Sequence, residues 1–223
     1  APTAVTSYMA SAGKVAAFAA LLRLFTSGLT ARVDDWRPVI WVLATLTIFV
    51  GSTMAVVQTN VKRMLAYSSI SHAGFILVGV EAASHRGSDG LASSMAYLAI
   101  YTMLVMGSFA ILISVAGKAD TAMSLDAFKG LAKRKPLLAL SFSALLFAQA
   151  GVPFTSGFVA KFGVIKSAVD AESYAIAVVA MVGAVIGAFL YLRIMVSMWM
   201  EDSTDNNDIV VPRGVAVVIA TSV

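Results

Sequence analysis

The sequence predicts an all-α polytopic membrane protein, a bundle of helices that cross the bilayer several times. Of the 223 residues, 59% are hydrophobic and 13% are charged, a composition outside the usual range of soluble domains. Apolar runs of about 20 residues recur along the chain, the length that an α-helix needs to cross a hydrocarbon core about 30 Å thick. Short loops between these runs carry most of the charges, as in other helical membrane proteins.

We expect six full membrane spans and the start of a seventh, which together form a single transmembrane domain over residues 1–223. The sequence begins without a methionine and stops inside an apolar run, so we expect it to be part of a longer chain. The expected spans are residues 4–25, 38–57, 64–80, 91–116, 137–168 with an interruption at 151–157, 173–200 and 211–223.

The first span carries a lysine in its interior. Ser7, Ser11 and Lys14 recur at helical spacing and share one face of an otherwise apolar helix. Because a lysine at the centre of a membrane helix costs roughly 2.5–3.5 kcal/mol, we expect Lys14 to face the interior of the protein. Ionisable residues in such positions mark ion pathways. Lys14 is therefore a candidate functional residue, and Ser11 is a candidate supporting group.

The second and fourth spans are predicted mainly from their apolar runs. Pro38 suits the first turn of the second span. Residues 81–90 are predicted to form a loop in which His85 is solvated, and residues 91–116 are long enough to cross the membrane with tilt. Tyr101 is a candidate polar group within this fourth span. The basic connection that follows contains the stretch Ser124–Leu131, which is expected to form a short helix at the membrane surface.

The third span opens with several polar residues. Tyr67, Ser68, Ser71 and His72 lie near its start. Ser68 and His72 are one helical turn apart, so the imidazole could bond this hydroxyl directly. The competing interpretation is a packing histidine whose hydrogen bonds are satisfied and which has no role in transport. The pattern leaves both interpretations open.

The fifth apolar stretch is too long for one helix. Residues 137–168 would form a helix about 48 Å long, against a hydrocarbon core of about 30 Å. Gly151, Pro153 and Gly157 are expected to break it, because proline removes a backbone donor and glycine tolerates unusual dihedral angles. Lys161 follows this break, and an ionisable residue beside a broken membrane helix indicates a transport site. The competing interpretation, a lysine that reaches the lipid headgroups, fits Lys166 better.

The sixth span carries two features of its own. Gly183 and Gly187 are four residues apart, a spacing that suits close contact with a neighbouring helix. Arg193, near the end of this span, is expected either to reach the headgroups or to pair inside the bundle.

The distribution of lysine and arginine predicts the orientation. The positive-inside rule places the loops at 58–63, 117–135 and 201–213 in the cytoplasm. These loops carry Lys62, Arg63, Lys118, Lys129, Lys133, Arg134, Lys135 and Arg213, whereas the alternate loops carry Arg32, Arg37, Arg86 and Lys166. The net charge of +4 therefore reflects topology, and no nucleic-acid partner is expected. The sequence has no cysteine and only two histidines, so neither disulfides nor a metal site are expected.

Three motifs occur in a fixed order: Ala1-Pro-Thr-Ala-Val-Thr leading to Lys14, Asn60-Val-Lys-Arg-Met-Leu-Ala-Tyr-Ser-Ser-Ile-Ser-His72-Ala-Gly-Phe, and Gly151-Val-Pro-Phe-Thr-Ser-Gly-Phe-Val-Ala-Lys161-Phe. They resemble the antiporter-like subunits of respiratory complex I and of the cation/proton antiporter complexes, and the resemblance covers essentially the whole sequence. Lysine at position 161 favours the N type of these subunits over the M type, which typically has glutamate there. The sequence from Asn60 to Met64 is a weaker indication of the same type.

The resemblance implies a helical bundle with inverted five-helix repeats, of which this sequence would hold the second. It implies a proton-pumping subunit of an NADH:quinone oxidoreductase with no redox centre and no catalytic residue of its own. Lys14, His72 and Lys161 would transfer protons, supported by the polar side chains of Ser11, Tyr67, Ser68, Ser71 and Tyr101.

The resemblance also implies partners. NADH, flavin, iron–sulfur clusters and quinone would be bound by partner subunits, and the direct partners would be other membrane-arm subunits and the lipid bilayer. The alanine- and valine-rich composition favours a bacterial plasma membrane, because mitochondrial members are usually less rich in these residues, and the mitochondrial inner membrane or the thylakoid are the alternatives. Two other functions remain open. One is a subunit of a multisubunit sodium/proton antiporter or membrane-bound hydrogenase, and the other is a structural subunit whose lysines form internal ion pairs.

Overall fold

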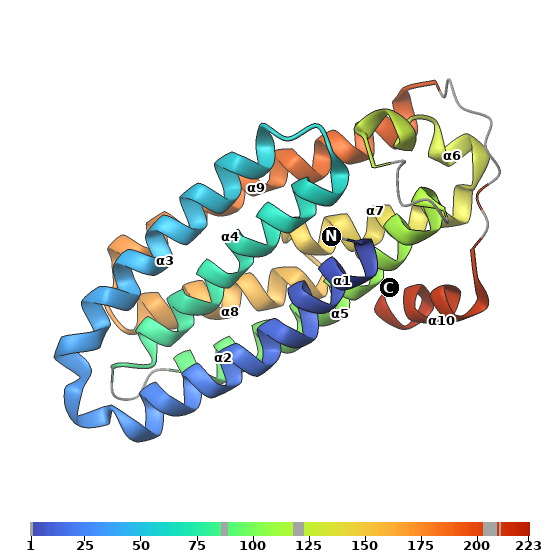
Figure 1. Ribbon diagram of the computed structural model, residues 1–223. Coiled ribbons are helices and arrows are strands. Elements are labelled where there is room, and N and C mark those ends of the chain that lie inside the picture. The colour runs from blue at the N-terminus through green and yellow to red at the C-terminus, as the bar shows by residue number, and fades with distance from the viewer. Residues whose placement is uncertain (1, 86–88, 118–122, 203–208, 210) are drawn as a thin grey trace.

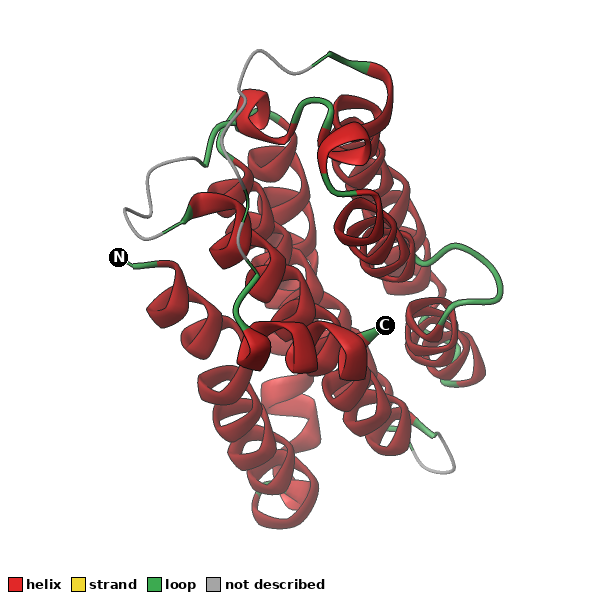
Figure 2. Ribbon diagram, turned by 90° about the vertical axis from the view of Figure 1, so that its right-hand side faces the viewer, coloured by secondary structure: helices red, strands yellow, loops and turns green. Residues whose placement is uncertain are grey.

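The described residues fold into a bundle of helices. The computed structural model describes residues 2–85, 89–117, 123–202, 209 and 211–223. Figures 1 and 2 show the long helices side by side in an elongated bundle, so the all-α prediction is confirmed. The segments that are long and apolar enough to cross a membrane are Thr3–Gly28, Thr30–Val56, Val61–Ala82, Gly90–Ala116 and Tyr174–Met200.

The elements follow one another with short connections. The first segment consists of α1 (Thr3–Tyr8), a π-helical turn (Met9–Gly13), α2 (Lys14–Arg23) and a second π-helical turn (Leu24–Gly28). After a 3₁₀ turn (Thr30–Arg32) come α3 (Val33–Val56), α4 (Val61–Ala82), α5 (Gly90–Ala116), a 3₁₀ turn (Leu125–Phe128), α6 (Leu131–Arg134), α7 (Pro136–Ala150), α8 (Ser156–Asp170), α9 (Tyr174–Met200) and α10 (Arg213–Ser222).

Helix α4 lies at the centre of the bundle. It packs against α3, α5, α8 and α9, as can be followed in Figure 1. In its most apolar window 78% of the residues are buried, against 17% in Thr3–Gly28. The Asn60 side chain caps the start of α4 by accepting a hydrogen bond from the Arg63 backbone N–H at 3.1 Å. Polar side chains on α4 can therefore meet partners from several helices at once.

Two predicted boundaries are wrong at the end of the bundle where α3 begins and α4 ends. Helix α3 starts at Val33, so Pro38 lies inside the helix and the acidic pair Asp34 and Asp35 occupies the first turn, where the helix dipole favours negative charge. Helix α4 continues to Ala82, so Glu81 is helical and buried instead of lying in a loop. His85 contacts Glu81 and Ser173 instead of being merely solvated.

The break between α7 and α8 covers residues 151–155, which is shorter than the predicted interruption at 151–157. Gly151 ends α7 with φ at +84°, and its N–H bonds back to the Ala148 carbonyl at 3.0 Å. The Thr155 hydroxyl caps α8 by accepting a hydrogen bond from the Phe158 N–H at 3.3 Å. Gly157 already belongs to α8. A Cβ at Gly157 would overlap the carbonyl group of Ala148, so this glycine allows the two half-helices to touch.

Helix α9 packs closely against α3. A Cβ at Gly183 would collide with Ile48 of α3, whereas Gly187 faces open space, so only the first of the two glycines makes the expected close contact. The Arg193 guanidinium donates to the carbonyls of Val56 and Gln58 at 2.9 and 3.0 Å. It therefore pairs inside the bundle, at the end of α3.

Candidate functional site

The Lys161 side chain reaches back from α8 across the helix break to the end of α7. Its ammonium donates to the main-chain carbonyls of Gln149 and Ala150 at 2.9 and 2.8 Å. These carbonyls belong to the last turn of α7, where no helical N–H follows to bond them and where the helix dipole favours a cation. The Lys161 residue is only 7% exposed. Lys161 is thus an internal group, and the interpretation as a headgroup-seeking lysine is wrong.

Neighbouring residues surround the Lys161 side chain and fix the end of α7. A Cβ on Gly151 would lie 2.8 Å from the Lys161 Cδ, so the glycine leaves room for the lysine stem as well as adopting the positive φ. The Phe75 ring of α4 lies below the ammonium, with 5.2 Å between Nζ and the ring centroid. The Gln149 side-chain amide donates to the Ser108 hydroxyl at 2.6 Å. The end of α7 is thereby fixed to α5.

Lys14 contacts α4 at Ser69. Its Nζ donates to the carbonyl oxygen and to the hydroxyl of Ser69, both at 2.5 Å. It also lies over the Tyr101 ring of α5, 4.9 Å from the centroid. The predicted supporting group Ser11 instead donates to the Ser7 carbonyl of its own helix at 2.6 Å, within a π-helical turn that ends just before Lys14. Ser69, which the sequence pattern did not single out, takes the place expected for Ser11.

His72 occupies the space between the two lysines. Its Nδ1 lies 2.7 Å from the Tyr97 hydroxyl and its Nε2 lies 2.8 Å from the Tyr191 hydroxyl. The imidazole stacks on Tyr101, with ring centroids 4.6 Å apart. Ser68 is bonded to the Tyr191 hydroxyl, so the predicted direct bond between Ser68 and His72 is wrong. Tyr191 connects the two residues, and the sequence pattern pointed to neither Tyr97 nor Tyr191.

The remaining predicted polar groups, Ser71 and Tyr67, have other contacts. The Ser71 hydroxyl lies 2.8 Å from that of Ser52 on α3. The Ser52 hydroxyl in turn reaches the Gly183 carbonyl at 3.4 Å. Tyr67 is partly buried and packs against the hydrophobic core.

Two small cavities lie between His72 and Lys161. In each of them, the space in which the centre of a water molecule can lie is about 10 Å³. Both are lined by His72 and Lys161. The first also includes Ser68, Ser71 and Tyr191, and the second includes Tyr97, Tyr101 and Gly157. A space of this size holds about one water molecule. His72 and Lys161 share no direct hydrogen bond, and a single water in either cavity is enough to bridge polar groups on both sides.

Neither lysine is neutralised by an acid in the described part of the chain. The ion pairs there join residues nearer the helix ends, such as Lys166 with Asp170 and Lys133 with Asp202. Lys14 and Lys161 contact oxygen dipoles and aromatic rings instead. Among the described residues, therefore, the interpretation as structural ion pairs has no support. We call Lys14, His72, Lys161 and the three tyrosines at 97, 101 and 191 the polar axis.

Residues 1–187 match the family model described as NADH:quinone oxidoreductase/Mrp antiporter, TM. The chain belongs to this family. Among its antiporter-like relatives, subunit N 1 of the NADH-quinone oxidoreductase of Herpetosiphon aurantiacus is 45% identical over 91% of this chain and 41% of its own length. Subunit N of Mycobacterium bovis is also 45% identical, over 95% of this chain and 40% of its own length. The chain thus spans about two fifths of these relatives, and the prediction of the N type is confirmed.

Solved structures of antiporter-like proteins have the same fold. A chain of the respiratory complex I from Thermus thermophilus with bound Aureothin superposes with a TM-score of 0.81 and 27% identity, over 100% of this chain and 48% of that chain. A chain of the Mrp complex from Dietzia superposes with a TM-score of 0.71 and 29% identity, over 81% of this chain and 33% of that chain. The chain is accordingly a multi-pass membrane protein of the antiporter-like family.

Proposed function

We propose that this chain carries protons through the membrane as the second inverted repeat of an N-type subunit of NADH:quinone oxidoreductase. The observation that carries the proposal is the polar axis, in which the half-buried Lys14 and the buried Lys161 flank the buried His72 inside a largely apolar bundle. Ionisable groups inside a membrane bundle are costly and mark transport pathways. A lysine on the free carbonyls of a broken helix is the arrangement expected of a transport site.

The chemistry of the axis suits proton transfer. Burial favours the neutral form of an amine, whereas carbonyl oxygens at a helix end favour its charged form. A lysine that moves on or off such carbonyls therefore takes up or releases a proton. A neutral imidazole accepts a proton at one nitrogen and releases one from the other. Protons pass from Lys14 through His72 to Lys161, which exchanges them with the far side of the membrane or an adjoining subunit.

The driving reaction lies outside this chain. The named relatives are subunits of NADH-quinone oxidoreductases. Their names support a complex in which partner subunits bind NADH, flavin, iron–sulfur clusters and quinone. Other membrane-arm subunits and lipid surround the bundle, in a bacterial plasma membrane, since these relatives are bacterial. Quinone reduction in the partners changes the conformation or the charge near the axis, and this change drives the proton transfer.

The test combines capture with one substitution. The full-length subunit is captured from gently solubilised native membranes, and the captured material is assayed for NADH:quinone reductase activity and, after reconstitution, for proton pumping. Lys161→Ala is expected to abolish pumping in complexes that still assemble. Lys166→Ala is the matched control, because Lys166 pairs with Asp170 near the end of the same helix. Normal pumping by the Lys161→Ala complex would refute the proposed function.

A second candidate is a subunit of a multisubunit sodium/proton antiporter. The superposition on the Mrp complex chain favours it, and the family description includes this class. A captured complex without NADH:quinone reductase activity, but with sodium/proton exchange after reconstitution, would assign the chain to this second class.

A further inference from the structure

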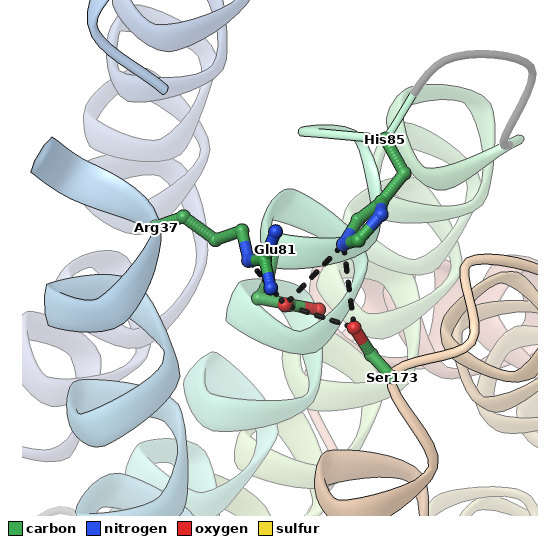
Figure 3. A network of polar contacts seen from close by, with 4 residues as sticks. All are labelled: Arg37, Glu81, His85 and Ser173. Carbon is green, nitrogen blue, oxygen red and sulfur yellow. Dashed lines mark hydrogen bonds and ion pairs between the residues drawn. The ribbon is translucent and has the colours of Figure 1, made fainter. Parts of the chain in front are cut away.

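A second polar cluster lies at the end of the bundle opposite the basic loops. Here α3 begins, α4 ends and α8 passes into α9. Arg37, Glu81, His85 and Ser173 meet at this point, as Figure 3 shows. We call these four residues the Glu81 cluster. It contains none of the residues of the polar axis.

Three elements converge on one oxygen of Glu81. The Ser173 hydroxyl donates to Oε1 at 3.0 Å. The Arg37 Nε and the His85 Nε2 lie 3.5 and 3.8 Å from the same atom, and His85 also lies 3.4 Å from the Ser173 hydroxyl. Glu81 is thus positioned by α3, by the turn after α4 and by the start of α9.

The other carboxylate oxygen of Glu81 is buried without a hydrogen bond. The whole residue is 1% exposed, and it is the one buried acidic side chain among the described residues. A buried carboxylate oxygen without a hydrogen-bond donor costs free energy, so this atom calls for a reason. A proton on Oε2 would remove the charge from that oxygen.

The Glu81 cluster opens into a cleft of about 590 Å³. The cleft is also lined by Asp170, the last residue of α8, and by Glu172 and Ser173 from the connection between α8 and α9. The Asp170 carboxylate pairs with Lys166, and the side chain of His85 is partly exposed. His85 thus contacts the buried carboxylate and also borders the cleft, where its imidazole can exchange a proton with water.

Hydroxyl groups line part of the way from Lys161 to the Glu81 cluster. On the buried face of α8, Ser167 lies between Lys161 and the end of the helix. The Ser167 hydroxyl is 2.7 Å from that of Ser93 on α5. From Lys161 to Ser167 the helix rises by about 9 Å. Ser167 and Ser93 thus place a pair of hydroxyl groups between the level of Lys161 and the end of α8.

We propose that the Glu81 cluster is a proton-exchange site, in which Glu81 takes a proton on Oε2 and releases it through His85 into the cleft. The carboxylate becomes a neutral acid when the proton arrives from the bundle interior. It is restored when the proton passes to the neutral imidazole, which then gives a proton to water. Among the described residues, the charged groups that line this cleft besides Glu81 are Arg37 from α3, His85 from the turn after α4, Asp170 at the end of α8 and Glu172 just after it. This exchange site rests on the proposed function and adds to it a place where protons leave the protein.

The direct test is infrared difference spectroscopy of the full complex in native lipid. Lowering the pH is expected to produce a carbonyl-stretch signal of a protonated carboxylic acid in the unaltered complex. The signal is expected to be lost in Glu81→Gln and retained in Glu172→Gln, the control on the same cleft. Identical spectra for the unaltered and Glu81→Gln complexes would overturn the exchange site, because Glu81 would then keep one protonation state throughout.

Pumping measurements separate this site from the proposed function. Glu81→Gln is expected to lose proton pumping, and Glu81→Asp, which keeps a carboxyl group, is expected to retain it. Normal pumping by Glu81→Gln together with an inactive Lys161→Ala complex would overturn the exchange site and leave the proposed function intact. Normal pumping by Lys161→Ala would overturn the proposed function, and the infrared comparison would still decide whether Glu81 exchanges a proton.

Discussion

The Nε2 atom of His72 lies 2.8 Å from the hydroxyl of Tyr191, a residue 119 positions further along the chain. The same hydroxyl is bonded to Ser68, one turn before His72 on α4. Tyr191 on α9 thereby joins two polar groups of α4 that do not bond each other. Because a phenolic hydroxyl both donates and accepts, this bridge can change its direction when the imidazole changes its protonation.

Tyr191→Phe tests this bridge. The substitution leaves the His72 Nε2 and the Ser68 hydroxyl without their shared partner inside the bundle, which is expected to cost about 1–3 kcal/mol of stability. Proton pumping should slow as well, because one hydrogen bond of the imidazole is lost. Thermal unfolding and pumping by the reconstituted complex measure the two effects. Tyr67→Phe is the control, and equal behaviour of both variants would show that the bridge has no role.

Lys161→Arg separates charge from proton release. Arginine keeps a cation for the carbonyls of Gln149 and Ala150, which Lys161 bonds at 2.9 and 2.8 Å, but it does not deprotonate in proteins. We therefore expect an assembled complex that reduces quinone and does not pump protons. Simultaneous assays of NADH oxidation and proton uptake check this outcome. Pumping at the unaltered rate would mean that Lys161 acts only through its charge.

Gly157→Ala tests the contact between the two half-helices. A Cβ there would overlap the Ala148 carbonyl, a backbone group that cannot turn aside. Pushing α8 away from α7 is expected to cost about 1–3 kcal/mol and to displace Lys161. Gly187→Ala is the matched control, because a Cβ on Gly187 meets nothing within 4 Å. Denaturant-induced unfolding of both variants gives the comparison, and an equal loss would contradict the argument.

Lys129 gives a prediction outside the membrane-spanning helices. Hydrogen bonds to Asp126 and Glu201, at 2.8 and 3.0 Å, hold the pKa of Lys129 above its ordinary value. These contacts therefore favour the folded segment below the ordinary lysine pKa, and their contribution is lost as the pH rises through the raised value. Asp126→Asn is expected to lower the Lys129 pKa. Acylation of Lys129, followed by mass spectrometry as the pH is varied, should then reach half-maximal rate at a lower pH. Glu201→Gln should shift the pH profile of Lys129 acylation less, because the hydrogen bond to Asp126 raises the pKa of Lys129 more than the one to Glu201. An unshifted profile in Asp126→Asn would contradict the role of Asp126.

The residues of the site were predictable to different degrees. Lys14, His72 and Lys161 stand out in the sequence, because a charged or titratable side chain in an apolar run is costly wherever the helix packs. Tyr97, Tyr191 and Ser69 did not stand out, because tyrosine and serine are common in membrane helices and signal nothing until a partner is known. Glu81 was assigned to a loop because it follows an apolar run. Only the continuation of α4 to Ala82 made it a buried acid.

The sequence alone determined that this chain is a helical membrane protein, where its apolar segments lie, and that one of them is broken beside a lysine. These properties are local, since hydrophobicity, proline and glycine act on the helix in which they stand. The tertiary structure decided which atoms receive the polar side chains. Lys161 bonds the carbonyls of α7, and His72 lies between tyrosines of α5 and α9. Such contacts depend on how separate helices pack against one another, which the periodicity of a single helix does not specify.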